Sequence, residues 1–403
     1  MKLAGLSKMW AQEYEKAQMK TITTTAELAT YCAQAAKYPY VTVDTEFLRE
    51  RTYYSKLCLI QLAYMGEGGD DAVLVDPLAE GLDLAPLYEL FKDENVVKVF
   101  HAARQDLEIF FVDQGIIPKP LFDTQVAAMV CGFGEQAGYE TLVRKIAKDN
   151  VDKSSRFTDW SRRPLTDAQK TYALADVTHL RVIYENLSAE LEKSGRKKWV
   201  AEEMAVLNDP ATYQADPDNA WKRVKTRTSS GKFLSIVREL ARFRELHAKN
   251  RNIPRNRVFK DDALVEIAST KPTSEDDLGR SRLLLREARR GDIATGILAA
   301  VQAGLNTKPK DAPRIDASRE KLQVNPALAD MLRVLVKSAA DNEGVAQKLI
   351  ANSADLDAIA GGLRDVAALS GWRKEVFGAD ALRLCDGKIG LAVKGEKVVT
   401  FTL

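Results

Sequence analysis

The sequence predicts an α/β domain with a mixed β-sheet, followed by α-helical bundles. Between residues 22 and 195, short apolar segments typical of strands alternate with segments whose apolar residues recur at helical spacing. Beyond Lys193 the strand-like segments stop and the pattern becomes helical. A chain of 403 residues is too long for one ordinary domain, and its 45% hydrophobic content can supply more than one core.

The α/β part begins with a helix over 25–37, because threonines of N-cap type precede apolar residues at helical spacing. The next three strands are close enough along the chain for an antiparallel meander, with a Gly/Asp turn over 67–71. Strands are expected over 41–47, 57–63, 72–76, 95–100 and 121–123. Helices are expected over 84–92, 107–113 and 125–131, and from Leu165 to beyond Leu180.

The second half is expected to hold two helical units and a terminal hairpin. A connector helix is expected over 199–207. The first unit has helices over 233–249, 260–268 and 277–290, and the second has helices over 328–338, 346–350, 354–360 and 372–377. Similar helix starts at Ser274–Leu278 and Ser353–Leu356 suggest that the two bundles are duplicates. Residues 391–399 predict a β-hairpin with a Lys-Gly turn.

Composition excludes several classes of protein. Mean hydropathy is −0.26, and the absence of an apolar run of about 18 residues excludes a membrane-spanning helix. Met1 to Lys20 lacks the apolar segment of a signal peptide, so residues 1–21 are expected to be an extension, with Met19 as an alternative start. The cysteines form no C-x-x-C pair, which argues against a zinc site or disulfides and for a reducing, cytoplasmic location.

Charge is distributed unevenly, although the net charge is only +2. Residues 22–193 contain 18 Lys and Arg against 27 Asp and Glu, whereas residues 215–260 contain 13 against 4. An acidic module joined to a basic one suits a metal-using site paired with a surface that binds a polyanion. The alternative is that the basic stretch, with its cluster of Lys222, Arg223, Lys225 and Arg227, is a solvated surface.

The strand over 41–47 ends in two carboxylates, Asp44 and Glu46, which project from one face because alternate side chains share a face. Two like charges held this close favour a divalent cation between them, although on spacing alone a solvated strand end is the commoner explanation. Asp106 follows His101 where the fourth strand gives way to a helix, so it is expected to face the same crevice. Tyr172 and Asp176 lie one helical turn apart, on one face of the helix that starts after Pro164.

Four acids and a tyrosine in this order on an α/β frame resemble the DEDDy group of 3′–5′ exonucleases. The resemblance is closest to the ribonuclease D family, and it extends through Arg51–Tyr54, Leu59–Leu62, Asp123–Gln125 and Ser154–Pro164. It implies a ribonuclease H-like mixed-sheet exonuclease domain over 22–195, a linker helix over 196–214 and an HRDC domain over 215–295. It further implies a second HRDC-like bundle over 305–380, which leaves the hairpin at 381–403 without a functional account.

The same resemblance implies the roles of the site residues. Asp44, Glu46 and Asp176 are expected to hold an ion that activates water, with Asp44 bridging to a second ion that Asp106 supports through solvent. The two ions would be Mg²⁺ or Mn²⁺, which prefer carboxylate oxygens. Tyr172 would orient the attacking water, because a phenol is a poor base at neutral pH. Candidates for gripping the terminal nucleotide are Thr45, Phe47 and His101.

The expected activity is therefore metal-dependent removal of nucleoside 5′-monophosphates from RNA 3′ ends, with transfer-RNA precursors as the family's substrate. A DNA 3′–5′ exonuclease is the first alternative, because contacts to the 2′-hydroxyl are not visible in the sequence. A non-catalytic RNA-binding adaptor is the second, and the presence of all five site residues disfavours it. No membrane association and no obligate protein partner are expected.

Overall fold

The computed structural model describes residues 19–66, 71–152, 154–228, 230–314 and 322–403, which form two compact units. The expected extension over 1–21 and the turn over 67–71 therefore fall largely outside the described residues. The first unit combines residues up to Phe47 with 57–212 and 321–403, and the second combines Leu48–Lys56 with Tyr213–Glu320. Among the described residues, no helix is long and apolar enough to span a membrane.

The first unit is built on a six-stranded mixed sheet in the order β1-β4-β3-β2-β5-β6. Its strands are β1 (Thr21–Ile22), β2 (Tyr40–Leu48), β3 (Lys56–Tyr64), β4 (Ala72–Val75), β5 (Val97–Phe100) and β6 (Leu121–Asp123). β2, β5 and β6 are parallel, β1 is parallel to β4, and β3 is antiparallel to β4. The mixed sheet confirms the predicted class. The short strand β1 was not predicted, because two residues are too few to show a period.

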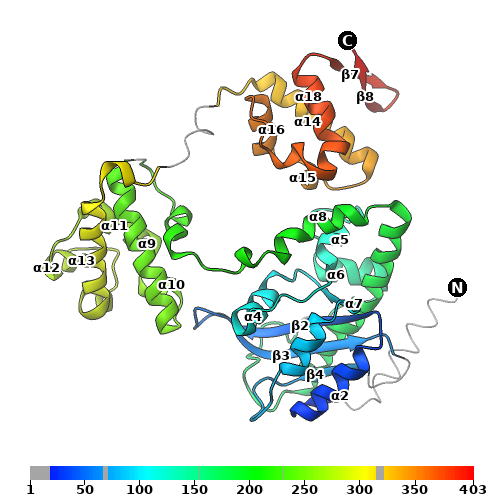
Figure 1. Ribbon diagram of the computed structural model, residues 1–403, viewed down its shortest axis with the longest axis horizontal. Coiled ribbons are helices and arrows are strands. Elements are labelled where there is room, and N and C mark those ends of the chain that lie inside the picture. Colours follow the sequence, from blue (N-terminus) through cyan, green and yellow to red (C-terminus); the bar gives the residue numbers. More distant parts are fainter. Residues whose placement is uncertain (1–18, 67–70, 153, 229, 315–321) are drawn as a thin grey trace. The chain divides into compact units, whose positions relative to one another are not determined.

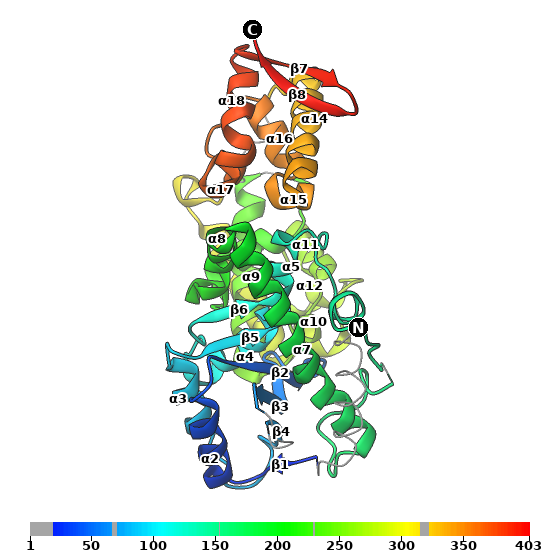
Figure 2. The same cartoon turned by 90° about the vertical axis from the view of Figure 1, so that its right-hand side faces the viewer.

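Helices cover both faces of this sheet. They are α2 (Thr25–Ala35), α3 (Ala85–Lys92), α4 (Arg104–Gln114), α5 (Thr124–Val130), α6 (Tyr139–Leu142), α7 (Asp167–Ser194) and α8 (Lys197–Asn208). In Figure 2 the strands lie between α2 and α3 on one side and α7 on the other. Phe91, Phe100 and Phe110 pack edge to face and are almost fully buried, which gives the sheet an aromatic core.

The C-terminal part of the first unit is a helical bundle with a hairpin. It comprises α14 (Pro326–Glu343), α15 (Gln347–Ile350), α16 (Ser353–Ala360), α17 (Gly371–Arg373), α18 (Ala379–Cys385), β7 (Ile389–Lys394) and β8 (Lys397–Thr402). The bundle shares one apolar core with α5, α7 and α8. Trp199 on α8 stacks on Trp372 with 4.4 Å between ring centroids, and the Arg373 guanidinium forms an ion pair with the Glu203 carboxylate at 2.7 Å. The hairpin, which the sequence predicted, packs beside α14 and α18 (Figure 2).

The second unit is a separate helical bundle (Figure 1). Its helices are α9 (Gly231–Arg251), α10 (Arg255–Val258), α11 (Asp261–Thr270), α12 (Glu275–Gly279) and α13 (Gly291–Asn306). The segment Leu48–Lys56, which leaves β2, belongs to this unit. There the Tyr53 phenol donates to the buried Glu245 carboxylate, and the Asn252 side chain accepts from the Tyr53 backbone.

The prediction of one helix over 277–290 is wrong. Only Glu275–Gly279 is α-helical, a 3₁₀ turn follows at Arg286–Arg289, and the long helix α13 begins at Gly291, beyond the expected one. The carboxylate of Glu266 interrupts the helix, because it accepts from Ser281 Oγ and from the backbone N–H groups of residues 282 and 283. This long-range partner is invisible to a periodicity argument. Because α13 runs to Asn306, the expected domain boundary at 295 falls inside it.

Candidate active site

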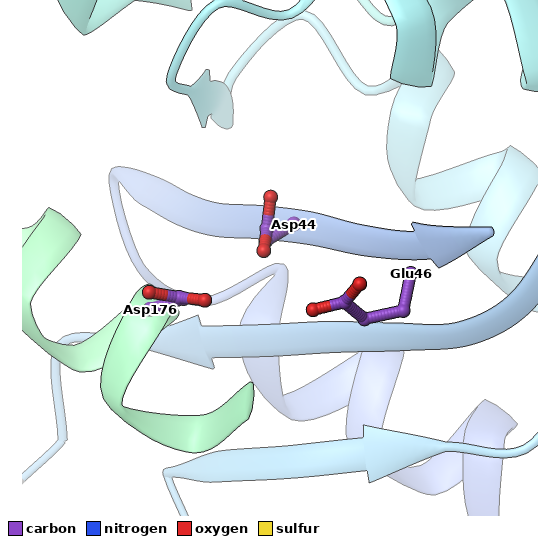
Figure 3. Close-up of side chains that lie close together, drawn as sticks. All are labelled: Asp44, Glu46 and Asp176. Atoms are coloured by element: carbon purple, nitrogen blue, oxygen red, sulfur yellow. The ribbon is translucent and has the colours of Figure 1, made fainter. Parts of the chain in front are cut away.

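Strand β2 aims its two carboxylates at α7 (Figure 3). Thr42, which has the same parity as Asp44 and Glu46, donates its hydroxyl proton to the Val177 carbonyl of α7 at 2.8 Å and contacts the Ala63 carbonyl of β3 at 3.1 Å. The buried Thr42 thereby joins the strand to the helix two residues before Asp44. This hydrogen bond holds the end of β2 at a fixed distance from α7.

Helix α7 carries the other two predicted groups. Its start is defined by a capping box, in which the Thr166 hydroxyl accepts from the Gln169 backbone and the Gln169 side chain accepts from the Thr166 backbone. Tyr172 and Asp176 follow on one face, and the Tyr172 phenol hydrogen-bonds the Asp176 carboxylate. The phenol of Tyr139, on α6, donates to the Asp176 backbone carbonyl. The helix is therefore held at its cap and again at the turn that carries Asp176.

Asp44, Glu46 and Asp176 form one cluster, in which one ligand oxygen from each lies within 4.8 Å of the others (Figure 3). Burial and the negative charges of Asp44, Asp176 and Asp106 raise the pKa of Glu46 to about 10. Burial raises the pKa of Asp44 to about 6. Burial and the charge of Asp44 raise the pKa of Asp176, against a weaker opposing effect of Arg156. Burial and mutual repulsion of the acids therefore outweigh the favourable charge of Arg156.

Asp106 meets the sheet differently from the other acids. It lies near the start of α4, and its carboxylate accepts a hydrogen bond from Thr45, which has the opposite parity to Asp44 and Glu46. Asp106 was expected to face the same crevice, but it lies outside the three-carboxylate cluster among the described residues. Its charge still raises the pKa of Glu46. The placement is compatible with contact to an ion through solvent, which is the role that the resemblance implied.

The turn between β5 and α4 is held by Asp123, the last residue of β6. Its buried carboxylate accepts from the backbone N–H groups of Ala102 at 3.0 Å, Ala103 at 2.9 Å and Gln125 at 2.8 Å. Ala102 has φ of +55°, a conformation that needs such support. Asp123 thereby caps α5 and positions both His101 and the helix that carries Asp106.

His101 is oriented by Thr124. The Thr124 hydroxyl donates its one proton to the Phe100 carbonyl at 3.1 Å, so its contact of 3.0 Å with His101 Nδ1 requires Nδ1 to be the donor. Burial lowers the pKa of His101 to about 4, so the ring is neutral at physiological pH. The remaining nitrogen, Nε2, is then a hydrogen-bond acceptor.

These groups border a cavity of about 320 Å³. It is lined by Asp44, His101, Gly138, Tyr139, Glu140, Thr141, Val151, Arg156, Tyr172, Asp176 and Leu180. Of the three predicted nucleotide-binding residues, only His101 borders it; Thr45 faces Asp106, and Phe47 is half-buried on β2. The sequence reasoning missed Tyr139 and Arg156, which lie on a short helix and a turn with no period to mark them.

The donor set of the cluster fits a hard divalent cation. Three carboxylates offer oxygen ligands, with neither cysteine nor histidine among them, and burial, reinforced at Glu46 and Asp176 by neighbouring acids, raises the pKa of each. A bound cation would supply that charge and favour the ionised form of each group. The cavity can therefore combine a cation site with a neutral hydrogen-bond acceptor and a phenol.

Comparison with known proteins places this arrangement in context. Residues 19–192 match a family model described as 3′–5′ exonuclease, and residues 233–301 match the HRDC domain. The chain is 65% identical to the ribonuclease D of Jannaschia sp., over 94% of this chain and 98% of that protein, and 49% identical to that of Granulibacter bethesdensis, over 94% and 96%. It is also similar to the crystal structure of Escherichia coli RNase D, described as an exoribonuclease involved in structured RNA processing. That likeness has a TM-score of 0.80 and 28% identity over 92% of this chain and 99% of the other.

Proposed function

Because this chain belongs to the ribonuclease D family of 3′–5′ exonucleases, we propose that its carboxylate cluster is the site that cleaves the terminal phosphodiester bond of RNA. The chain is a 3′–5′ exoribonuclease. We propose that its products are nucleoside 5′-monophosphates released one by one from the 3′ end. The observation that carries the site assignment is the meeting of Asp44, Glu46 and Asp176 in one cluster, of which Asp44 and Asp176 line a cavity together with Tyr172.

The site is assigned two divalent cations, Mg²⁺ or Mn²⁺. Asp44, Glu46 and Asp176 would hold the first, Asp44 would also reach the second, and Asp106 would support the second through solvent. Such a pair of ions stabilises the charge that develops on the attacking and leaving oxygens. The raised pKa values of the three clustered acids support this assignment, because a bound cation would stabilise the ionised form of these buried carboxylates.

Tyr172 is assigned to orient the attacking water. Burial and the charges of Asp176, Glu46 and Asp44 raise the pKa of its phenol, so at neutral pH the group keeps its proton and can act as a donor but not as a base. Its hydrogen bond to Asp176 directs the hydroxyl toward the cluster. Orientation of this kind lowers the barrier by fixing the attacking atom in line with phosphorus.

His101 is assigned to the terminal nucleotide, with Thr45 and Phe47 as further candidates. A neutral His101 with a free Nε2 can accept a hydrogen bond from a ribose hydroxyl in the cavity. Thr45 would act through Asp106, to which it donates. This acceptor supports RNA as the substrate, and we propose the 3′ ends of transfer-RNA precursors in particular.

The helical half is assigned to substrate binding. Residues 233–301 form an HRDC domain, and Lys222, Arg223, Lys225 and Arg227 lie just before it as candidates for phosphate contact. We also propose that 305–380 includes a second HRDC-like bundle. In its support, α16 begins with a capping box of Asn352 and Asp355, as α12 begins with one of Ser274 and Asp277.

The test compares the intact protein with its Asp176→Asn variant on 3′-labelled RNA and on DNA of the same sequence, in Mg²⁺, in Mn²⁺ and in EDTA. We expect the intact protein to release labelled mononucleotide from RNA, and to do so only when metal is present. The variant should lose at least about 10²-fold in rate but keep RNA binding, and Asp341→Asn, an exposed acid on α14, should match the intact protein. Equal cleavage in EDTA or undiminished cleavage by Asp176→Asn would refute the site, and faster cleavage of DNA would favour the DNA alternative.

A further inference from the structure

The turn that precedes α7 carries an aromatic ring into solvent beside the cavity. The Phe157 side chain is 91% exposed, which is the largest exposure of a bulky apolar side chain among the residues that the structure describes. A single exposed apolar residue is ordinary on a protein surface. Phe157 differs because its neighbour Arg156 lines the cavity and its guanidinium lies 5.3 Å from the Phe157 ring centroid.

The turn itself is firmly anchored on both sides of this ring. The buried Ser155 accepts from Thr158 through its carbonyl, at 2.8 Å from the Thr158 hydroxyl, and that hydroxyl accepts from the Gln169 side chain at 3.1 Å. Trp160 is 2% exposed and packs 6.0 Å from the ring of Tyr172. The fold therefore fixes the residues around Phe157 to the cap of α7 and to a functional side chain, yet leaves Phe157 itself uncovered.

We propose that Phe157 is a stacking platform for the base of the nucleotide next to the 3′-terminal one, with Arg156 neutralising the phosphate between the two nucleotides. The proposal rests on the assignment of the cavity as the exonuclease site and adds a substrate contact to it. At about 320 Å³ the cavity lies at the small end of ligand pockets, so it suits one nucleotide, and the adjacent base lies outside it.

The chemistry of the pair fits an unpaired RNA end. A phenyl ring accepts the face of any base, so stacking holds the strand without selecting its sequence, as an exonuclease that shortens successive ends requires. Arg156 also lowers the pKa values of Glu46 and Asp176, which places its positive charge within electrostatic reach of the cluster. A cation there attracts the phosphate chain toward the carboxylates, which would otherwise repel it.

The test measures RNA binding in the Asp176→Asn background with Mg²⁺, so that the RNA stays intact. Single-stranded RNAs carry an abasic site at the last, second-last or fourth-last position. With Phe157 present, the abasic site at the second-last position should weaken binding about 5- to 150-fold, the contribution of one stacked base. Phe157→Ala should weaken binding of unmodified RNA by a similar factor and make binding insensitive to that abasic site, while Phe157→Trp should restore both. The matched control is Phe401→Ala, an exposed aromatic on β8, which should leave binding unchanged.

Arg156 has its own readout. Arg156→Gln should reduce the slope of log affinity against log salt by about 0.7, as expected for the loss of one phosphate contact on a single strand, and Arg156→Lys should keep the slope. Equal abasic penalties with and without Phe157, or a salt slope that Arg156→Gln does not change, would overturn the platform. If the protein nevertheless degrades unmodified RNA and Asp176→Asn does not, the exonuclease site stands and only the stacking proposal fails.

Discussion

Replacing Glu46 by glutamine should stabilise the metal-free protein while it removes a ligand of the proposed metal site. Burial and three neighbouring acids raise the Glu46 pKa from an ordinary 4.5 to about 10. The folded protein therefore holds a proton that the unfolded chain releases, so this group favours folding most below pH 4.5 and progressively less as the pH rises toward 10. Glutamine resembles the protonated acid but needs no proton, so Glu46→Gln removes this loss of stability.

The size of the effect follows from the same pKa values. Above pH 4.5 loss of this proton stabilises the unfolded chain relative to the folded protein by about 1.4 kcal/mol per pH unit. At pH 7 the folded protein is therefore about 3 kcal/mol less stable than it would be without this titration. For a unit of this size, each kcal/mol moves the melting temperature by roughly 2–4 °C. In EDTA at pH 7 we therefore expect Glu46→Gln to melt about 6–12 °C above the unaltered protein, with the difference vanishing near pH 4.5.

The assay is thermal unfolding in EDTA from pH 4.5 to pH 8, repeated with Mg²⁺ or Mn²⁺. An ion at 100 times its dissociation constant adds about 2.7 kcal/mol to the unfolding free energy of the unaltered protein. Metal should therefore narrow or reverse the difference in melting temperature between the two proteins. Glu80→Gln, at an exposed position, is the control for charge removal and should show no pH-dependent gain. A destabilised Glu46→Gln protein in EDTA, or a gain that is the same at every pH, would refute the reasoning.

Three further predictions follow from the site. Tyr172→Phe removes the phenol that we propose orients water, so kcat should fall about 10²-fold with KM nearly unchanged in steady-state kinetics; an equal loss in binding would contradict that role. Asp123→Asn leaves at least one backbone donor of the 102–103 turn unpaired and should cost about 1–3 kcal/mol in unfolding free energy together with activity, so stable but inactive protein would contradict it. Metal affinity should rise with pH between about 6 and 9, because Glu46 and the residual protonated Asp44 must lose their protons; calorimetry in two buffers of different ionisation enthalpy would detect that release, and identical heats would contradict it.

The strands and helices that the sequence predicted well are those with a strong local signal. β2 and β3 were recognised as short apolar runs, α7 by its start after Pro164, and the terminal hairpin because a Lys-Gly turn separates two apolar runs. The helix over 277–290 was wrong because Glu266, on another helix, captures the backbone that would continue it. Such a competition between local and distant hydrogen bonds leaves no trace in the spacing of apolar residues.

The apolar core that the C-terminal bundle shares with the nuclease helices could also not be predicted from the sequence. Trp372 was expected to start a helix, but its partner Trp199 lies in a different predicted domain. Apolar faces show that a helix must be covered, not which other helix covers it. The two predicted domains consequently fall within one compact unit.

The sequence by itself determined which candidate site residues share a face. Parity along one strand put Asp44 and Glu46 on one face, and helical spacing put Tyr172 and Asp176 together, because these relations depend only on local backbone geometry. Only the tertiary structure decided that Asp106 reaches the strand through Thr45, that Thr124 fixes the proton on His101, and that Arg156 lines the cavity with Phe157 beside it. Those relations join segments far apart in the chain, so they depend on how the sheet and its helices pack and not on any local period.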